Sequence, residues 1–365
     1  MEVFTAAEQG GHERILFAQD GDSGLKAIIA VHSTVLGPAL GGTRFYPYAC
    51  EEDALADALR LSRAMTRKNA AAGLDFGGGK AVIMGDPHTL KSERLLRAYG
   101  RAIESLGGAY VTAEDVGTTI ADMEMIARET GYVTGAAHDS GGSGDPSPVT
   151  ARGLMAAMRG AARSLWGSPD LSGRHVAIQG VGKVGGAFAR LLAEVGACLT
   201  IADVNEEAVK GLASELGATI ASPDRVHATE CDVFAPCALG GALNPETVPE
   251  LRCAAVLGSA NNQLASDDLA ADLAARDILY VPDFIVNAGG VINLAEEVGR
   301  EYRLERANRR VDGIEATVIE LLARARETGV TPLDEAIARA DRRIREVGGL
   351  HARVARSPHT GSGAR

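Results

Sequence analysis

Apolar positions in the first third of the chain follow two different periods. The runs from Leu25 to Val31 and from Ala81 to Met84 have the length and apolar content of buried strands. Between these runs apolar side chains recur at helical spacing, at Leu55, Ala58, Leu59 and Met65. This pattern predicts a helix from about Glu51 to Thr66, and the acidic residues at its start suit the positive end of the helix dipole. The first third is therefore predicted to be a mixed α/β domain.

The second half of the chain alternates strand-like and helix-like segments after a turn-rich stretch, His138 to Pro148, that we predict to be a domain junction. In order, the segments are a helical run from Val149 to Leu165, the strand H-V-A-I-Q-G, a helix from Lys183 to Val195, the strand C-L-T-I-A-D, and apolar runs at Val233, Ala254 to Leu257 and Ile278 to Val281. Such alternation predicts βαβ units and a parallel sheet with helices on both faces. We therefore predict an α/β fold in which an N-terminal α/β domain is joined to a doubly wound, Rossmann-type domain.

Two domains are also the expectation from length, because 365 residues exceed what one hydrophobic core usually serves. We predict a first domain of residues 1–137 plus about 333–365 and a second of residues 138–332. A cleft between two such domains is a common place for a small-molecule site.

The C-terminal part is polar and basic. We predict two amphipathic helices between Arg300 and Arg345, broken near Gly329 and Pro332. The final segment R-S-P-H-T-G-S-G-A-R is predicted to be a disordered tail.

Composition narrows the classes of function. A net charge of −11 with no basic block gives nothing to attract nucleic acid or an anionic membrane. The N-terminus lacks the pattern of a signal peptide and no stretch is apolar enough to span a bilayer, so we expect a cytoplasmic protein. The five cysteines are scattered and odd in number, which suits reduced thiols. Neither they nor the eight histidines form a metal-ligand pattern, so no metal is expected.

Lysine is rare in this chain, with 6 lysines against 31 arginines. Two of the six, Lys68 and Lys80, flank the glycine-rich stretch K-N-A-A-A-G-L-D-F-G-G-G-K. The commonplace alternative is that both are solvated surface charges. Arginine cannot lose its proton in a protein, however, whereas the environment of a lysine amine can suit it to acid or base chemistry. The surrounding glycines favour a chemical role for the two lysines.

The sequence G-G-G-K from Gly77 to Lys80 raises the alternative of a phosphate-binding Walker loop. That loop, G-x-x-x-x-G-K-[ST], would need glycine at Leu74 and serine or threonine at Ala81. The spacing therefore disfavours a kinase or an ATPase.

A dinucleotide-binding fingerprint, G-x-G-x-x-G, occurs after the strand H-V-A-I-Q and opens the next helix. Its candidate cofactor-binding residues are Gly180, Val181, Gly182, Lys183, Val184 and Gly185. The glycines permit a tight turn, close approach to a pyrophosphate and close helix packing, while the helix N-terminus offers amide donors. Asp203 ends the following strand, where its carboxylate would bind ribose hydroxyls and repel the extra phosphate of NADP. We therefore expect NAD; a structural glycine turn in another α/β protein is the alternative.

Six ordered motifs, spread over nearly the whole chain, carry a family resemblance. They are G-P-A-L-G-G-T-R at 37–44, the lysine-flanked stretch at 68–80, T-A-E-D-V-G-T at 112–118, A-P-C-A-L-G at 235–240, G-S-A-N-N-Q-L at 258–264 and N-A-G-G-V-I-N at 287–293. Together with the fingerprint, they resemble the glutamate, leucine, phenylalanine and valine dehydrogenase superfamily, and most closely its valine and leucine members.

The resemblance implies NAD-dependent, reversible oxidative deamination of an L-amino acid to its 2-oxo acid and ammonia. By this resemblance Lys68 would hold the substrate α-carboxylate, helped by Gly41, Gly42 and the amide of Asn262. A free lysine has a pKa near 10.4, so a base at this position needs surroundings that favour the neutral amine. Lys80 would then act as general base toward the attacking water.

Two further residues take roles from the same resemblance. Asp115 would exchange protons with the substrate amine, although an aspartate that caps a turn is the structural alternative. Thr150 matches a position near the nicotinamide amide. The first domain would then be the catalytic, substrate-binding and oligomerisation domain, and the second the NAD-binding domain.

The positions that resemble the family's side-chain pocket are apolar, namely Leu40, Ala113, Val291 and Leu294. A buried substrate carboxylate would be uncompensated there, so glutamate is disfavoured and a branched-chain substrate (valine, leucine or isoleucine) is expected. Leu294 is shared with some phenylalanine enzymes, which leaves phenylalanine dehydrogenase open. An alternative of another class is a non-catalytic NAD-binding sensor. The implied partner is a small-molecule amino acid, in a homo-oligomer that serves branched-chain amino acid catabolism.

Overall fold

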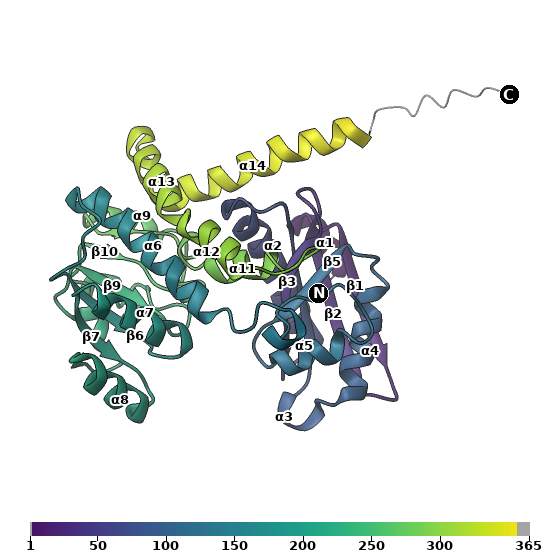
Figure 1. Ribbon diagram of the computed structural model, residues 1–365. Helices are drawn as coiled ribbons and strands as arrows, with labels where there is room; N and C mark the ends of the chain where they lie inside the picture. Colours follow the sequence, from purple (N-terminus) through teal and green to yellow (C-terminus); the bar gives the residue numbers. More distant parts are fainter. Residues whose placement is uncertain (1, 356–365) are drawn as a thin grey trace. The chain divides into compact units, whose positions relative to one another are not determined.

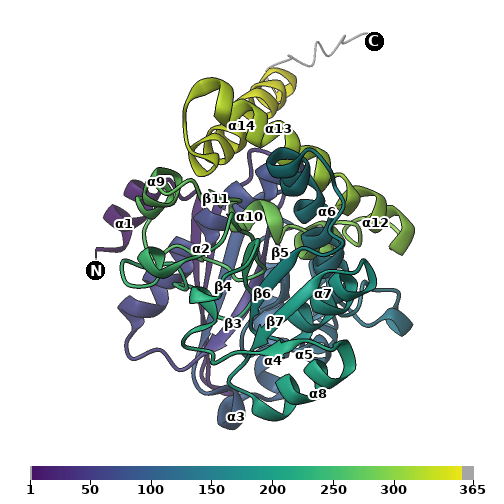
Figure 2. The same cartoon turned by 90° about the vertical axis from the view of Figure 1, so that its left-hand side faces the viewer.

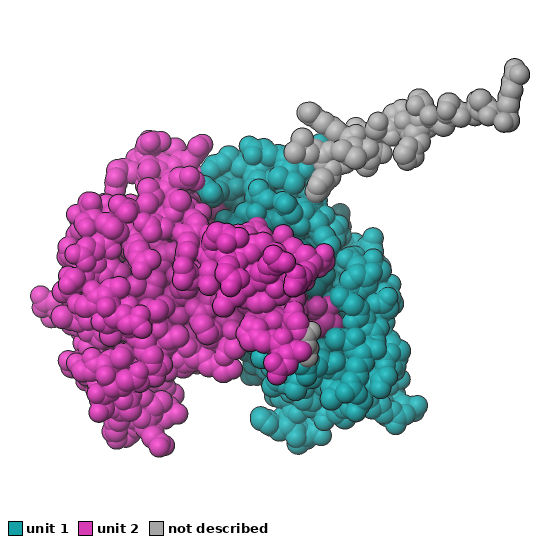
Figure 3. Space-filling model, viewed as in Figure 1, with its two compact units in different colours: residues 1–132, 338–365 teal, residues 133–337 magenta. Residues whose placement is uncertain are grey.

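The computed structural model describes residues 2–355, so the tail predicted at 356–365 lies outside the described residues. The chain forms two compact units, which Figure 3 draws in different colours. The first unit comprises Met1–Tyr132 with Ala338–Arg365, and the second comprises Val133–Ile337. No helix in the described part of the chain is long and apolar enough to cross a membrane.

Unit 1 is built on a mixed five-stranded sheet with the strand order β1-β2-β4-β3-β5. Its elements are α1 (Val3–Gly10), β1 (Arg14–Asp20), β2 (Leu25–Ser33), β3 (Ala39–Tyr46), α2 (Glu51–Ala71), β4 (Gly77–Met84), α3 (Pro87–Leu90), α4 (Glu93–Glu104), β5 (Tyr110–Glu114) and α5 (Ile120–Ile126). The strand β3 lies parallel to β4 and to β5, while β2 is antiparallel to β1 and to β4. The predicted strands at Leu25 and Ala81 are confirmed.

The helix α2 begins at Glu51 as predicted but runs on to Ala71, so the predicted end at Thr66 is wrong. Alanines 70 and 71 are good helix formers, and the amide of Asn69 donates to the carbonyl oxygens of Leu40 and Gly77. Those hydrogen bonds tie the last turn to the sheet. Lys68 therefore lies within this last turn and not beyond the helix.

The register of β3, β4 and β5 places alternate side chains on the face that α2 covers. Leu40 is opposite Gly78, Gly42 is opposite Ala113, and laterally paired residues point to the same side of a sheet. Packing of α2 residues with Val82 identifies this side as the α2 face. Lys80, two residues before Val82, projects to the same face. Candidate residues from three strands are thus gathered on one side of the sheet.

Glycines in β3 and β4 permit an unusually close approach of the two strands to each other and of α2 to β4. A Cβ atom added at Gly78 would lie 2.1 Å from the backbone nitrogen of Thr66, and one added at Gly41 would lie 1.7 Å from the carbonyl oxygen of Gly79. Both distances are far below van der Waals contact. Close packing within unit 1 therefore requires these glycines.

Two partly buried histidines, His12 and His32, join the N-terminal segment to α2. A ring nitrogen of His12 lies 2.9 Å from the hydroxyl of Ser62, and one of His32 lies 2.7 Å from that of Thr66. The two rings meet edge to face at 4.9 Å. Burial, with help from the charge of His12, lowers the pKa of His32 to about 4.

Unit 2 contains a six-stranded, fully parallel sheet with the order β11-β10-β9-β6-β7-β8. Its elements are α6 (Ser147–Trp166), β6 (His175–Gln179), α7 (Lys183–Glu194), β7 (Cys198–Ala202), α8 (Glu206–Leu216), β8 (Thr219–Ile220), β9 (Val233–Pro236), β10 (Ala255–Val256), α9 (Leu269–Ala275), β11 (Leu279–Tyr280), α10 (Asp283–Val286), α11 (Gly289–Ala295), α12 (Leu304–Asp312) and α13 (Ile314–Thr328). Figures 1 and 2 show α7 and α8 beside β6 and β7. The strand order reverses between β6 and β9, and the predicted Rossmann fold is confirmed.

The C-terminal part differs from the prediction in two respects, the first being that the last helix reaches Ala355, beyond the predicted end at Arg345. The break near Gly329 and Pro332 is confirmed, since α13 ends at Thr328 and α14 spans Pro332–Ala355. A second break at Gly313 divides the first predicted helix into α12 and α13. In unit 1, Arg343 on α14 donates to the carboxylate of Asp75 at 2.7 Å.

We expect Gly78→Ala to destabilise the protein by roughly 2 to 3 kcal/mol, because a methyl group at this position overpacks the contact with α2. The matched control is Gly211→Ala in α8, where an added Cβ meets nothing within 4 Å among the described residues. That change should stabilise by about 0.5 to 1 kcal/mol, as alanine is the better helix former. Urea unfolding of both variants is the measurement, and equal midpoints would contradict the close-packing argument.

Candidate active site

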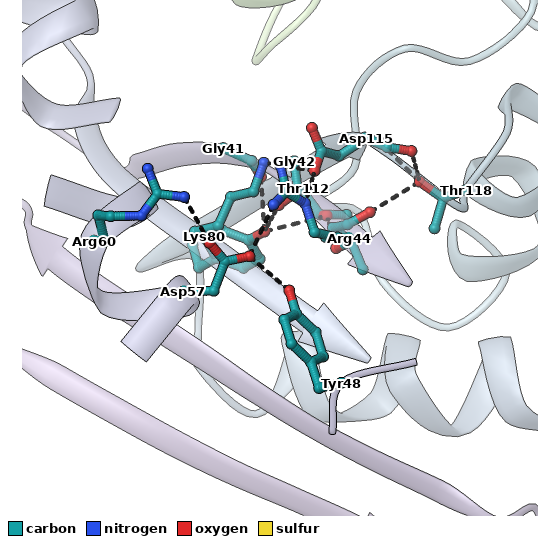
Figure 4. A network of polar contacts seen from close by, with 12 residues as sticks. Gly41, Gly42, Arg44, Tyr48, Asp57, Arg60, Lys80, Thr112, Asp115 and Thr118 are labelled. Carbon is teal, nitrogen blue, oxygen red and sulfur yellow. Dashed lines mark hydrogen bonds and ion pairs between the residues drawn. The ribbon is translucent and has the colours of Figure 1, made fainter. Parts of the chain in front are cut away.

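Lys80 is a buried lysine on a central strand of unit 1. Its residue is 5% exposed, and its ammonium lies 2.9 Å from Oδ2 of Asp115 (Figure 4). Lysine is almost never this buried unless it is paired. The structure thus brings together the two residues to which the resemblance gives proton-transfer roles.

The motif T-A-E-D-V-G-T fixes the position of Asp115 directly after β5. The backbone N–H of Asp115 donates to the hydroxyl of Thr118, which donates in turn to the carbonyl oxygen of Thr43 at 2.9 Å. Gly117 adopts a φ of 81°, and a Cβ there would lie 1.9 Å from the carbonyl oxygen of Phe45. Since Thr118 closes this turn, the side chain of Asp115 is available to bind cations.

The carboxylate of Asp115 binds two cations through one oxygen. Besides Lys80, the Nε of Arg44 donates to the same Oδ2 at 3.0 Å. Burial raises the pKa of Asp115, but the adjacent charges of Lys80 and Arg44 outweigh burial and hold that pKa below its usual value. Asp115 is therefore ionised at neutral pH. Its side chain binds the two cations, while the hydroxyl of Thr118 bonds the backbone of the turn.

Sequence reasoning gave no role to Arg44, although it lay within a quoted motif. Its Nη1 donates to Oδ2 of Asp57 at 2.8 Å, and the hydroxyl of Tyr48 donates to the same oxygen at 2.7 Å. Arg60 completes the network by binding the other oxygen of Asp57 (Figure 4). Strand alternation was the available signal. Arg44 and Leu40 are four positions apart on β3, so their side chains lie on the same face of the sheet.

Lys68 and the glycines of β3 occupy the same region of unit 1. The turn of α2 that carries Lys68 lies against β4, as the crowding between Gly78 and Thr66 requires. Gly42 is crowded by the residues after β5, since a Cβ there would lie 2.9 Å from that of Asp115. Strand packing therefore explains why Gly42 is glycine, and its predicted contact with substrate stays a prediction.

The fingerprint glycines in unit 2 have three different physical reasons. Gly180 has a φ of 97°, so the turn requires glycine there. A Cβ on Gly185 would lie 2.0 Å from the carbonyl oxygen of Gly180, so the packing of the helix against the turn requires glycine at 185. At Gly182 an added Cβ would meet nothing within 4 Å among the described residues, and φ is −63°. Nothing in the described protein requires glycine at this position. A pyrophosphate approaching the backbone at the start of α7 would require it, so the loop fits a dinucleotide.

Asp203 follows β7 and holds the fingerprint loop. Its Oδ2 accepts a hydrogen bond from the backbone N–H of Val181 at 2.7 Å, and its Oδ1 accepts one from the N–H of Asn205 at 2.9 Å. A carboxylate has about four acceptor sites, so these two hydrogen bonds leave capacity for ribose hydroxyls. At the start of α7, Lys183 places its ammonium 3.4 Å from a carboxylate oxygen of Asp145.

Asn262 has a strained backbone, with a φ of 53°. Non-glycine residues with positive φ are uncommon, and strain of this kind concentrates at functional sites. Beside it, Asn287 donates to Oδ1 of Asn261 at 2.9 Å, while its own buried Oδ1 has no hydrogen-bond partner among the described residues. Asn287, which contacts this loop, therefore offers a polar atom that protein contacts do not use.

The remaining candidate residues are placed as follows. In α6, the hydroxyl of Thr150 donates to the carbonyl oxygen of Pro146 at 2.9 Å, which leaves its oxygen able to accept. Leu40 and Ala113 are buried on the α2 face of the unit 1 sheet. Val291 and Leu294 lie three residues apart on α11, hence on one side of that helix. Among residues 2–355 no group of His, Cys, Asp and Glu side chains is arranged to hold a metal ion.

Two family models match the chain. One is described as Glu/Leu/Phe/Val dehydrogenase, dimerisation domain, and matches residues 12–132. The other is described as Glutamate/Leucine/Phenylalanine/Valine dehydrogenase and matches residues 141–206 and 199–346.

Individual relatives agree with the family models. Valine dehydrogenase from Streptomyces coelicolor is 51% identical over 343 residues, which cover 93% of this chain and 94% of the relative. Leucine dehydrogenase from Geobacillus stearothermophilus is 48% identical over 363 residues, which cover 100% and 97%. The crystal structure of L-tryptophan dehydrogenase from Nostoc punctiforme matches with a TM-score of 0.82 at 42% identity, covering 94% of this chain and 99% of that one. The chain therefore belongs to the Glu/Leu/Phe/Val dehydrogenase family of oxidoreductase enzymes.

Proposed function

We propose that this enzyme catalyses the reversible, NAD-dependent oxidative deamination of branched-chain L-amino acids to 2-oxo acids and ammonia. The observation that carries the proposal is the buried pair of Lys80 and Asp115, in a chain whose relatives at 46–51% identity are valine and leucine dehydrogenases. A buried, paired lysine that can give up its proton is what this chemistry needs.

The residues of unit 1 would bind the substrate and move its protons. Lys68 would bind the α-carboxylate through its charge, with the backbone at Gly41 and Gly42 and the amide of Asn262 in unit 2 as further contacts. Asp115, ionised beside its two cations, would accept and return a proton at the substrate amine. These roles use a permanent positive charge at Lys68 and an aspartate that is ionised before it accepts the proton.

Lys80 would work as the general base. When bound, NAD would accept the hydride that leaves the substrate Cα, so that the amine becomes an iminium ion. Neutral Lys80 would take a proton from the water that adds to this iminium carbon. It would then return the proton as the C–N bond breaks and ammonia leaves.

The cofactor would be held by unit 2. Backbone amides at the start of α7 would bind the pyrophosphate, through the loop formed by Gly180, Val181, Gly182, Lys183, Val184 and Gly185. Asp203 would accept from the adenosine ribose hydroxyls and repel a 2′-phosphate. Thr150 would accept a hydrogen bond from the nicotinamide carboxamide.

Side-chain selectivity is proposed to rest on apolar residues from both units. Leu40 and Ala113 would contribute from the sheet of unit 1, and Val291 and Leu294 from α11. Because one methylene in such a pocket is worth only about 1 to 3 kcal/mol, activity should overlap among valine, leucine and isoleucine. The similarity to a tryptophan dehydrogenase favours aromatic amino acids, phenylalanine included, as the second candidate.

We further propose functional domains close to the two structural units. Residues 1–137 plus about 333–365 would bind substrate and form the contacts of a homo-oligomer, and residues 138–332 would bind NAD. The family model named a dimerisation domain covers residues 12–132, and one similar structure is of a hetero-hexameric glutamate dehydrogenase. Light scattering of the purified chain tests the oligomer.

The function is tested by following NADH absorbance at alkaline pH with a panel of L-amino acids. We expect kcat/KM to be highest for valine, leucine or isoleucine. A higher value for phenylalanine or tryptophan would favour the second candidate. Absence of turnover with every amino acid would refute the enzyme and favour a non-catalytic NAD-binding sensor.

We expect Lys80→Ala to lower kcat by about 10²- to 10⁴-fold while NAD still binds, because a general base contributes on this scale. Lys68→Ala should mainly raise KM, by roughly 10- to 100-fold, since a charge-assisted hydrogen bond to the substrate is lost. Steady-state kinetics with titration calorimetry of NAD separate the two effects. An unchanged kcat in Lys80→Ala would refute the assignment of the base.

We expect removal of the charge at Asp203 to reduce the preference for NAD over NADP. Asp203→Asn keeps an acceptor for the N–H of Val181, whereas Asp203→Ala removes that hydrogen bond as well. Both variants should lower the ratio of NAD to NADP affinity by about tenfold or more, and the alanine variant should also weaken NAD binding. Fluorescence titration of both cofactors is the measurement, and an undiminished ratio in both variants would count against the ribose role.

A further inference from the structure

Two cations compete for one carboxylate oxygen beside the proposed base. The Oδ2 atom of Asp115 is 2.9 Å from the ammonium of Lys80 and 3.0 Å from Nε of Arg44. A carboxylate paired with Lys80 alone would stabilise its ammonium and so oppose its use as a base. Arginine keeps its charge at any pH in a protein, so Arg44 is a permanent competitor for that oxygen.

Arg44 is fixed in place by a second carboxylate. It spans from Asp115 to Asp57, and Asp57 is held in addition by Tyr48 and Arg60. Burial raises the pKa of Asp57, but hydrogen bonds from Tyr48 and Arg60 and the nearby arginine charges outweigh burial and lower that pKa. The side chains of Arg44 and Asp57 are 24% and 14% exposed, so water screens this bridge only in part.

From this geometry we propose that Arg44 is a positioning residue of the reaction: it shares Asp115 with Lys80 and so allows Lys80 to release its proton while Asp115 stays paired. The proposal rests on the proposed function, since it concerns the same base. When Lys80 is neutral, Asp115 still has Arg44 as its counterion, so no buried carboxylate is left uncompensated. When Lys80 is charged, Arg44 repels it and weakens the hold of Asp115 on it.

The other ionisable groups around Lys80 do not replace this effect. The helix and strands beside β4 carry further ionisable side chains, and Tyr48 follows β3. They are His32 on β2, Tyr110 on β5, and Asp57, Arg60, Arg63, Arg67 and Lys68 on α2. With a pKa of about 4, His32 is neutral at neutral and alkaline pH, and burial raises the pKa of Tyr110 to about 12. Neither group therefore changes charge across the pH range in which the base would work.

The test is to titrate Lys80 directly in the full chain and to measure activity beside it. With only six lysines, selective ¹³Cε labelling gives few NMR signals, and the Lys80 signal is assigned by its absence in Lys80→Arg. In Arg44→Met we expect the titration midpoint of Lys80 to rise by about one pH unit. The acidic limb of the kcat/KM profile should move by the same amount, which is about a tenfold loss on that limb.

Three further variants make the result specific. Arg44→Lys keeps the charge and should shift the midpoint less. In Asp57→Asn the charge of Arg44 is no longer shared, so the midpoint should fall; this variant decides the matter if Arg44→Met does not fold. Arg97→Met is the matched control, because Arg97 pairs with Glu129 away from Asp115, and it should move neither readout.

Several outcomes would overturn the proposal. One is a Lys80 midpoint in folded Arg44→Met that equals the midpoint in Arg97→Met. Another is a kcat of Arg44→Met that is reduced equally at every pH. The third is a Lys80 midpoint in Asp57→Asn that is unmoved or raised. Absence of turnover in the unsubstituted chain would instead refute the proposed function. The NMR midpoints would then still decide whether Arg44 competes with Lys80 for Asp115.

Discussion

The close approach of α2 to β4 is the constraint on which the site in unit 1 depends. A side chain at Gly78 would collide with the backbone of Thr66, so only glycine lets this helix lie so near the strand. Because Lys80 follows Gly78 on the same face, its amine is enclosed between sheet and helix and is removed from water. The same approach places Asp57, on α2, within reach of Arg44. The packing of α2 against β4 therefore accounts both for the burial of the Lys80 amine and for the ionic groups around it.

Buried charge of both signs makes this region costly unless the groups are mutually satisfied. The structure meets that requirement with an alternating series in which Lys80, Asp115, Arg44, Asp57 and Arg60 bind one another in turn. In such a series, when one group loses its charge, its former partner still has an ion pair with the next group in the series. This is a suitable setting for a group that must be charged at one stage of a reaction and neutral at another.

Much of this architecture could be predicted from the sequence. Local periodicity was enough for the Rossmann strands, and glycine spacing was enough for the fingerprint loop, because both signals lie within about 30 residues. The end of α2 was missed because Asn69 stabilises the last turn through contacts with distant strands. The role of Arg44 was missed for a similar reason. Its partners Asp57 and Asp115 are 13 and 71 positions away, and only the packing of α2 and the strand register bring them together.

The two histidines that join the N-terminal segment to α2 make the stability of the fold depend on pH, because their pKa values are lowered in the folded protein. A group whose folded pKa is lowered contributes stability above its unfolded pKa and loses it as the pH falls toward the folded value. For His32 that window extends from the unfolded value of 6.5 down to about 4. The hydrogen bond to Thr66 belongs to the helix turn that packs on Gly78, so acid would loosen the enclosure of Lys80 before it protonated the carboxylates. Proton uptake by His32 is thus expected to destabilise this part of unit 1 as the pH falls from 6.5 toward 4.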